Sequence, residues 1–255
     1  MTSSESKEAI WAEEFKVHSY DVDFKKMATL ESLCRHFQEA AWAHAEQLGV
    51  GYKKLQQENQ LWVLARLLVK AERYPTWGEM QTLHTWPRAA KSVFAMRDFE
   101  MLDSSATRIV AGASAWLVLD ATTRKPQRVD KLVSTIIGFS DRHALAQEPQ
   151  KLRPFESKPP MEEFTVRYSD IDVNGHVNNS RYIGWIMDAH PVEFHRAHEV
   201  SLFEVNYLAE TIGGDAISIF SQELAPGEYW YSITNPTTGA VVCRARIIWT
   251  PITQK

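Results

Sequence analysis

Apolar residues recur at helical spacing directly after Thr29. The stripe consists of Leu30, Leu33, Phe37, Ala40, Ala41, Ala45 and Leu48. Thr29 is a good N-cap residue and Gly49 stands where a helix commonly ends, so this spacing predicts one long, one-sided helix. A shorter stripe begins behind Asn178, runs over residues 182–187, and stops at Pro191, which cannot continue a helix. The pattern therefore predicts two amphipathic helices, one long and one short.

Runs dense in Val, Ile, Trp and Tyr follow each of the two predicted helices. They lie at residues 61–70, 107–119, 201–208 and 241–250. Such runs are typical of strands, and the turn residues that separate them favour antiparallel connections. Each half of the chain thus predicts a helix followed by antiparallel strands. A helix that covers a curved antiparallel sheet is an α+β arrangement.

The two halves also share a short sequence repeat. YDVDFKKMA, residues 20–28, aligns with SDIDVNGHV, residues 169–177, at a shift of 149 positions. Two aspartates and two apolar positions match, and the identities end where the first copy reads KKM and the second reads NGH. The same shift places Thr29 on Asn178, so both copies lead into a predicted helix through an N-cap residue. The repeat predicts two similar domains of which only one keeps a polar cluster.

Residues 124–160 separate the two halves and carry five of the eleven prolines. This composition predicts a linker, partly helical around Ser134 to Ala146, that crosses from one half to the other. We place the boundary near residue 150. The predicted domains are an N-terminal domain of residues 1–150 and a C-terminal domain of residues 151–255.

Composition excludes several classes of protein. A net charge of −4 and a pI near 6.2 argue against a dedicated nucleic-acid binder. No apolar run is long enough to cross a bilayer, and the polar, acidic start of the chain lacks the features of a signal or transit peptide, so we expect a cytoplasmic protein. Cys34 and Cys243 stand far apart, and His195 and His198 have no cysteine nearby. We expect no metal and no cofactor.

The segment RYSDIDVNGHVNNSRY, residues 167–182, concentrates two aspartates, three asparagines and a histidine. Taken singly, Asn178 is most simply a helix cap, and a lone histidine is more often structural. However, Asp172, Asn174 and His176 alternate along what we expect to be an extended segment at a helix entrance, and only one repeat has them. This conjunction favours an active site.

The tandem helix-and-sheet pattern and the motif DxNxHVNNxxY resemble the acyl-ACP thioesterases of the plant and bacterial type. The resemblance extends from about Phe15 to Ile252 and is most specific at residues 167–185. It implies a tandem double hotdog fold, in which each half is a long helix wrapped by a curved antiparallel sheet. The family also carries a glutamate in a Tyr-x-x-Glu pattern on the strand after the second helix, and here that glutamate is Glu210 in YLAE.

By this resemblance the catalytic residues are Asp172, Asn174, His176 and Glu210. Plant members commonly have a cysteine directly after the glutamate, whereas this chain has Thr211. A cysteine nucleophile is therefore a poor model for this protein. The missing transit peptide suggests a bacterial form.

Hydrolysis of a thioester requires an oriented water, a base, and donors for the oxyanion. Glu210 and His176 are the two side chains that together could act as the general base, and the sequence leaves open which of them takes the proton. Asn174 and the backbone amides around Val177 and Asn178 are candidate oxyanion donors at a helix N-terminus. Asp172 stands two residues before Asn174 on the same face of the expected extended segment, and it is the candidate that holds Asn174 or His176 in place.

The first repeat has Lys25 and Met27 in place of the asparagine and histidine, so we expect it not to catalyse. Its long helix is a candidate wall of the acyl-chain pocket, with Phe37 or Trp42 limiting the depth. For each aromatic residue alone, an ordinary core position is the simpler interpretation.

The resemblance implies acyl carrier protein, loaded with a fatty acyl chain, as the partner. A short basic run is a candidate docking site for that acidic protein, although such runs are more often solvated surface. Its residues are Arg124, Lys125, Arg128 and Lys131. Three alternatives stay open: an acyl-CoA thioesterase on the same fold, a non-catalytic regulator that binds acyl thioesters, and a hotdog dehydratase. Acyl-chain length cannot be inferred, and a homodimer is possible.

Overall fold

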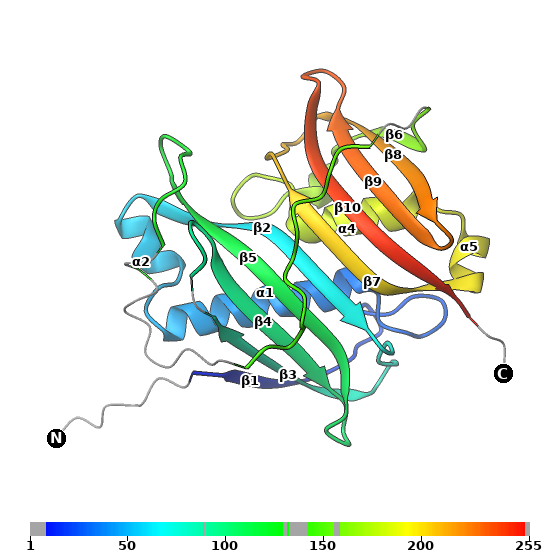
Figure 1. Cartoon of the computed structure of the whole chain (residues 1–255), viewed down its shortest axis with the longest axis horizontal. Coiled ribbons are helices and arrows are strands. Elements are labelled where there is room, and N and C mark those ends of the chain that lie inside the picture. Colours follow the sequence, from blue (N-terminus) through cyan, green and yellow to red (C-terminus); the bar gives the residue numbers. More distant parts are fainter. Residues whose placement is uncertain (1–8, 89, 130–131, 133–141, 156–158, 253–255) are drawn as a thin grey trace.

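The computed structural model describes residues 9–88, 90–129, 132, 142–155 and 159–252. Ten strands form one antiparallel sheet in the order β1-β3-β4-β5-β2-β7-β10-β9-β8-β6 (Figure 1). The first half contributes β1 (Trp11–Lys16), β2 (Gln60–Ala71), β3 (Met80–Pro87), β4 (Ala95–Leu102) and β5 (Arg108–Asp120). The second contributes β6 (Glu162–Thr165), β7 (His198–Tyr207), β8 (Ala216–Ala225), β9 (Glu228–Asn235) and β10 (Ala240–Pro251).

This strand order is the same when it is read inward from either edge. The first half runs 1-3-4-5-2 and the second runs 6-8-9-10-7. The two halves meet where β2 pairs with β7, from Arg66 opposite Asn206 to Lys70 opposite Leu202. An approximate two-fold axis therefore passes between β2 and β7 and relates each strand of one half to a strand of the other.

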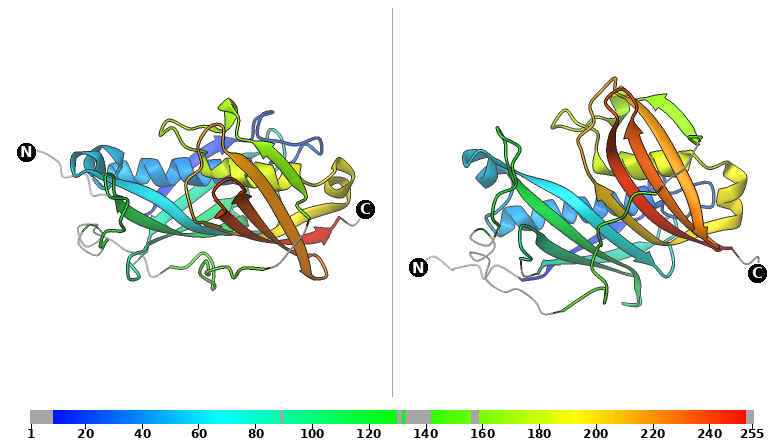
Figure 2. Two further views of the ribbon diagram at one scale, coloured as in Figure 1. Left: turned by 90° about the horizontal axis from the view of Figure 1, so that it is seen from above. Right: turned by 45° about the horizontal axis from the view of Figure 1, so that its top comes forward.

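The helices lie on one face of the sheet (Figure 2). They are α1 (Leu30–Gln47), α2 (Tyr52–Gln57), the 3₁₀ turn η1 (Tyr168–Asp170), α4 (Asn179–Asp188) and α5 (Val192–Ala197). Thr29 caps α1 by accepting from the Ser32 amide at 3.1 Å, and Gly49 follows the helix with φ +77°. Asn178 caps α4 in the same way. The two predicted amphipathic helices, the predicted strands and the α+β double hotdog architecture are confirmed.

A single cluster of buried apolar side chains runs through both halves and includes Phe37, Phe99, Ile183 and Phe203. The rings of Phe37 on α1 and Phe99 on β4 stack with their centroids 4.6 Å apart. Gly112 on β5 leaves room for this stack, because a Cβ there would lie 2.7 Å from the Phe37 ring. The shared core fixes the two helices against one continuous sheet.

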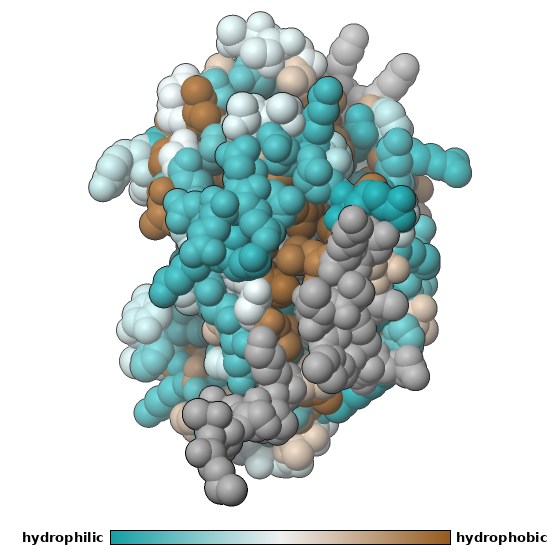
Figure 3. Space-filling view, turned by 90° about the vertical axis from the view of Figure 1, so that its left-hand side faces the viewer, coloured by the Kyte–Doolittle hydropathy of each residue, from teal (hydrophilic) through white to brown (hydrophobic). Residues whose placement is uncertain are grey.

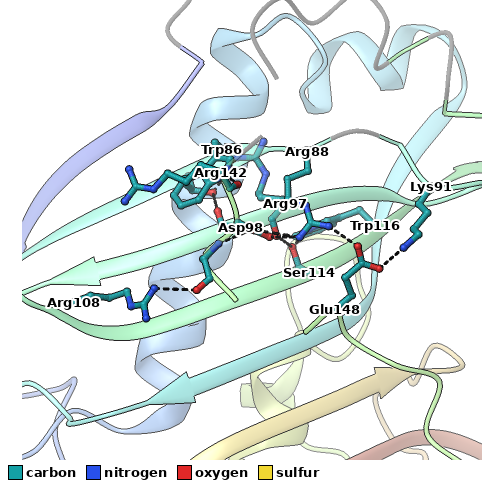
Figure 4. Close-up of polar contacts among 12 residues, drawn as sticks. Trp86, Arg88, Lys91, Arg97, Asp98, Arg108, Ser114, Trp116, Arg142 and Glu148 are labelled. Carbon is teal, nitrogen blue, oxygen red and sulfur yellow. Dashed lines mark hydrogen bonds and ion pairs between the residues drawn. The ribbon is translucent and has the colours of Figure 1, made fainter. Parts of the chain in front are cut away.

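The linker crosses the sheet face that the helices leave open (Figure 2). There it meets a buried ion network around Asp98, which pairs with Arg88 at 3.3 Å and accepts from the Ala144 amide at 2.9 Å (Figure 4). Arg88 continues to Glu148 at 2.6 Å. Further along, Asn206 of β7 accepts from the Leu152 amide at 2.8 Å. These bonds attach the linker to both halves.

The helix expected around Ser134 to Ala146 falls mainly on residues outside the described part of the chain. Its described end, residues 142–146, is not helical, because side chains of the sheet bind its backbone groups individually: the Trp86 indole donates to the Arg142 carbonyl at 2.8 Å. The domain boundary near residue 150 stays a prediction.

The end of the molecule at the first half is mostly hydrophilic, with apolar residues gathered in its middle (Figure 3). Among the described helices, none is both long and apolar enough to cross a lipid bilayer.

Candidate active site

The polar loop before α4 is a tight turn rather than the extended segment that the alternation predicts. The Asp172 amide donates to the His176 carbonyl at 2.8 Å, and the Gly175 amide donates to the Asp172 carbonyl at 3.0 Å. Gly175 has φ +78°, which glycine adopts without strain. The Asp172 carboxylate accepts from the Asn174 amide at 2.8 Å, a contact typical of turns that begin at aspartate. Asp172 therefore holds the backbone of Asn174, not its side chain.

His176 and Glu210, separated by 34 residues in the sequence, meet beside this turn. His176 Nε2 lies 3.5 Å from Glu210 Oε2, and both side chains are partly exposed. A backbone hydrogen bond connects the segments that carry these two side chains: the Val177 amide donates to the Thr211 carbonyl at 2.8 Å. The Tyr182 hydroxyl on α4 also donates to Thr211 Oγ1 at 2.8 Å. This support fixes the segment after β7, which carries Glu210, against the helix entrance.

Glu210 has a second partner that comes from the other half of the chain. The Arg124 guanidinium contacts Glu210 Oε2, the same oxygen that faces His176. Arg124 lies in the turn after β5, which the Asp120 carboxylate stabilises by accepting from the Thr123 amide at 2.7 Å. These hydrogen bonds lower the pKa of Asp120. The turn presents Arg124 at the site with φ +58°.

The other predicted docking residues lie close to Arg124 in sequence. Lys125 and Arg128 are exposed, and of this basic run only Arg124 is seen in contact with Glu210 among the described residues. Lys131 is outside the described residues. The sequence placed Arg124 on a docking surface, and no local signal could indicate its contact with a glutamate 86 residues away.

Family models match both halves of the chain. The model of the acyl-ACP thioesterase N-terminal domain matches residues 8–137, and that of the acyl-ACP thioesterase C-terminal domain matches residues 155–251. The chain belongs to the acyl-ACP thioesterase family.

Solved acyl-ACP thioesterases have the same architecture. An acyl-ACP thioesterase from Bacteroides thetaiotaomicron is 31% identical, with a TM-score of 0.86 over 96% of this chain and 100% of that chain. The 12:0-ACP thioesterase from Umbellularia californica is 26% identical, with a TM-score of 0.86 over 96% of this chain and 98% of that one. A palmitoyl-acyl carrier protein thioesterase from Gossypium hirsutum is 29% identical over 95% of this chain, which spans only 64% of the length of that plant protein.

Two backbone donors expected for an acyl-ACP thioesterase oxyanion are already used. The Val177 amide donates to Thr211, and the Asn178 amide donates to the Asp170 carbonyl at 2.9 Å. The expectation that these amides serve the thioester was wrong, because the turn needs both to close onto the helix. The following amide, that of Asn179 in the first turn of α4, has no hydrogen-bond partner among the described residues.

Both cysteines of this family member are buried and carry free thiols. Burial raises the pKa of Cys34 and of Cys243, so neither is a thiolate at neutral pH. Cys243 stands opposite Tyr207 on the neighbouring strand and is fully buried. In the described part of the chain, no group of three or more His, Cys, Asp or Glu side chains is arranged to hold a metal ion.

The first repeat of the chain reproduces the turn of the second repeat without its asparagine and histidine. Its Lys25 amide donates to Asp23 Oδ1 at 2.8 Å, and its Asp23 amide donates to the Met27 carbonyl at 2.9 Å. The Ala28 amide donates to the Pro75 carbonyl at 2.8 Å, as Val177 does to Thr211. Tyr74, directly before Pro75, therefore occupies the place of the glutamate.

Proposed function

We propose that the chain hydrolyses fatty acyl thioesters of acyl carrier protein to free fatty acid and holo-acyl carrier protein. The observation that carries this proposal is the contact of His176 with Glu210, 3.5 Å apart beside the N-terminus of α4, in a member of this family. Thioester hydrolysis requires a general base to take a proton from water, and a histidine held by a glutamate can serve as one. Catalytic hydrogen bonds are often long in a substrate-free site, so 3.5 Å is compatible with the role.

Asp172, Asn174, His176 and Glu210 have distinct roles in this proposal. Glu210 accepts from His176 Nε2 and orients the ring, so that Nδ1 takes a proton from water. The water oxygen attacks the thioester carbonyl carbon, the carbon–sulfur bond breaks as the oxyanion collapses, and the imidazolium returns the proton to the leaving sulfur. No covalent enzyme intermediate forms. The reverse assignment, in which Glu210 takes the proton and His176 orients the water, has the same atom balance.

The oxyanion needs donors that are free in the resting site. The Asn174 side chain is exposed on the turn before α4. The Asn179 backbone amide belongs to the first residue of α4, where the helix dipole favours negative charge. We assign these two groups to the thioester carbonyl. Asp172 acts indirectly, because it fixes the backbone of Asn174.

Acyl carrier protein is the proposed carrier because Arg124, which contacts Glu210, belongs to a basic run after β5. Lys125 and Arg128 are exposed beside Arg124, which is itself at Glu210. This placement would let an acidic carrier dock while its prosthetic arm reaches His176. The Gossypium hirsutum relative is named for thioesters of acyl carrier protein. Acyl-CoA is the alternative substrate. Homodimerisation and a cytoplasmic location stay predictions.

The test is thiol release from a panel of acyl carrier protein thioesters and matching CoA thioesters, with Glu210→Ala beside the wild type. We expect release from carrier protein that the substitution abolishes. Faster release from CoA thioesters would identify an acyl-CoA thioesterase instead. Tight acyl binding without release from either carrier would contradict the enzyme proposal and favour the regulator.

A further inference from the structure

Two tyrosines from the sequence motifs lie behind the candidate site. Tyr182, on α4, ends the segment RYSDIDVNGHVNNSRY, and Tyr207 begins YLAE at the end of β7. Their rings meet edge to face with the centroids 5.6 Å apart. Tyr182 is only 3% exposed, and both rings pack in the core that the two halves share. Each ring brings a hydroxyl into this largely apolar core, where a hydroxyl needs a hydrogen-bond partner.

The two hydroxyls bind in opposite directions between the same two segments. Tyr182, on the helix, donates to Thr211 Oγ1, directly after Glu210, at 2.8 Å. Tyr207, on the strand, donates to the Asn179 carbonyl in the first turn of α4 at 2.9 Å. The strand pairing of β7 ends at Tyr207, so Glu210 lies beyond the sheet. The side chains on both sides of Glu210 therefore attach its segment to the helix.

Neither tyrosine can itself act as a base at neutral pH. Desolvation raises the pKa of both Tyr182 and Tyr207. Both hydroxyls therefore keep their protons and stay donors. Any effect of the two tyrosines on the reaction has to come from the geometry that their hydrogen bonds impose.

The first repeat has no hydroxyl at any of the three equivalent positions. The turn and its backbone hydrogen bond align the two repeats, and the replacements are Leu33 for Tyr182, Ala71 for Tyr207 and Pro75 for Thr211. Leu33 and Ala71 are buried, and the first turn still closes through the equivalent backbone bonds. This turn therefore forms without the hydroxyls. They occur only in the repeat that carries Asn174 and His176.

We propose that Tyr182 and Tyr207 are positioning residues that hold Glu210 at a fixed place against the N-terminus of α4. His176 lies just before this helix, so the same two hydrogen bonds determine how its ring meets Glu210. The Asn179 amide, assigned above to the thioester carbonyl, belongs to the residue whose carbonyl Tyr207 binds. The inference rests on the proposed function, because it assigns both hydroxyls to the same reaction.

Steady-state thiol release from an acyl carrier protein thioester tests the proposal. Tyr182→Phe and Tyr207→Phe each keep the ring and remove one hydroxyl, so we expect both to fold. Because a displacement of about 1 Å can cost about a hundredfold in rate, kcat should fall about tenfold in each, with KM changed less than about twofold. Thr211→Val removes the acceptor and should give the same loss, and Thr211→Ser should recover most of it. Tyr182→Phe combined with Thr211→Val should lose no more than either alone.

Tyr231→Phe is the matched control, because it also removes a buried hydroxyl that has hydrogen-bond partners. The Tyr231 hydroxyl lies 2.7 Å from His190 Nε2 and accepts from the Trp249 indole at 3.0 Å. Neither partner belongs to the candidate site. Urea unfolding should show lower stability in this control and in both site variants, whereas kcat should fall only in Tyr182→Phe and Tyr207→Phe.

Nitrogen NMR of the His176 ring gives a second readout that needs no turnover. The chemical shifts of the two ring nitrogens show which of them carries the proton, and His176→Gln assigns the signals. Above neutral pH, Glu210 should hold the proton on Nε2 in the wild type. Tyr182→Phe should move the shifts towards the mixture of tautomers of a free imidazole. A wild type without thiol release would contradict the proposed function, while the ring signals would still test the positioning.

Folded Tyr182→Phe and Tyr207→Phe variants with the wild-type kcat and unchanged His176 signals would overturn the proposal. An equal loss of kcat in Tyr231→Phe would also overturn it, because the hydroxyls would then contribute only to stability. If Tyr182→Phe does not fold, Tyr207→Phe and the comparison of Thr211→Val with Thr211→Ser decide in the same way.

Discussion

Two turns of this chain have one backbone and two chemistries. The turns before α1 and before α4 close through the same hydrogen bonds at a constant shift of 149 residues. The His18 amide donates to Asp21 at 2.8 Å, and the Arg167 amide donates to Asp170 at 2.8 Å. Only the second turn carries an amide and an imidazole at its tip. The aspartates therefore specify the scaffold, and in the proposed mechanism the residues that follow them decide whether the scaffold can catalyse.

The largest expected effect separates the two tips directly. Asn174→Ala should lower kcat roughly a hundredfold to a thousandfold, the usual loss for one oxyanion donor, without changing the folded structure. Lys25→Ala, the matched change in the first repeat, should leave kcat unchanged. Steady-state thiol release with circular dichroism on both variants checks this. A folded Asn174→Ala enzyme at the wild-type rate would remove Asn174 from the mechanism.

The two helices behind the turns differ at His190, where the second repeat departs from the first. By the same shift His190, two residues after the end of α4, stands at the place of Ala41, which lies inside the longer α1. It is buried, and its Nε2 lies 2.7 Å from the Tyr231 hydroxyl. Burial, with smaller effects of His195 and His198, lowers the pKa of His190 from 6.5 to about 4.

This shift predicts a pH-dependent stability. Below pH 6.5 the unfolded chain binds a proton at His190 that the folded chain does not, so the free energy of unfolding falls as the pH drops towards 4. Between pH 7.5 and 4.5 the loss should be on the order of 2 kcal/mol. Urea unfolding of the wild type and of His190→Phe at both pH values measures this loss. It is the change in the free energy of unfolding of the wild type between the two pH values, minus the same change for His190→Phe. If the free energy of unfolding changed equally with pH in both proteins, His190 would be protonated in the folded state.

A matched pair of aspartates tests whether scaffold and chemistry separate. Asp172→Ala and Asp23→Ala each remove a carboxylate that accepts a turn amide at 2.8 Å, and Asp23 also accepts the Met27 amide at 3.4 Å. Each should lower the free energy of unfolding by about 1 kcal/mol. Only Asp172→Ala should also lower kcat, because only its turn positions Asn174 and His176. Equal loss of activity in both variants would mean that the first turn takes part in catalysis.

Most of the fold could be predicted because its signals are local. Apolar spacing and caps located α1 and α4, and the repeat at a constant shift indicated two similar halves. The shape of the catalytic turn was missed, since alternation of polar residues suggested a strand while Gly175 and the aspartate side chain favour a turn. The occupied amides of Val177 and Asn178 were also missed, because their acceptors lie on other segments. Family resemblance supplied the pairing of His176 with Glu210, which spacing alone does not show.

Substitution of Arg124 should have the smallest effect on activity. It compares the two halves most directly, because the first half contributes Arg124 to the candidate site of the second. Its contact with Glu210 is between side chains that are 38% and 43% exposed, so it should contribute only about 0.2–1 kcal/mol. Arg124→Gln should therefore lower kcat/KM roughly two- to fivefold. Since Glu210 acts on every substrate, the loss should be equal for acyl carrier protein thioesters and for a small acyl thioester that lacks a carrier. Lys125→Gln, one residue along the same turn, should raise KM for the carrier substrate alone. If Arg124→Gln also affects only the carrier substrate, Arg124 belongs to the docking surface and Glu210 depends on His176 alone.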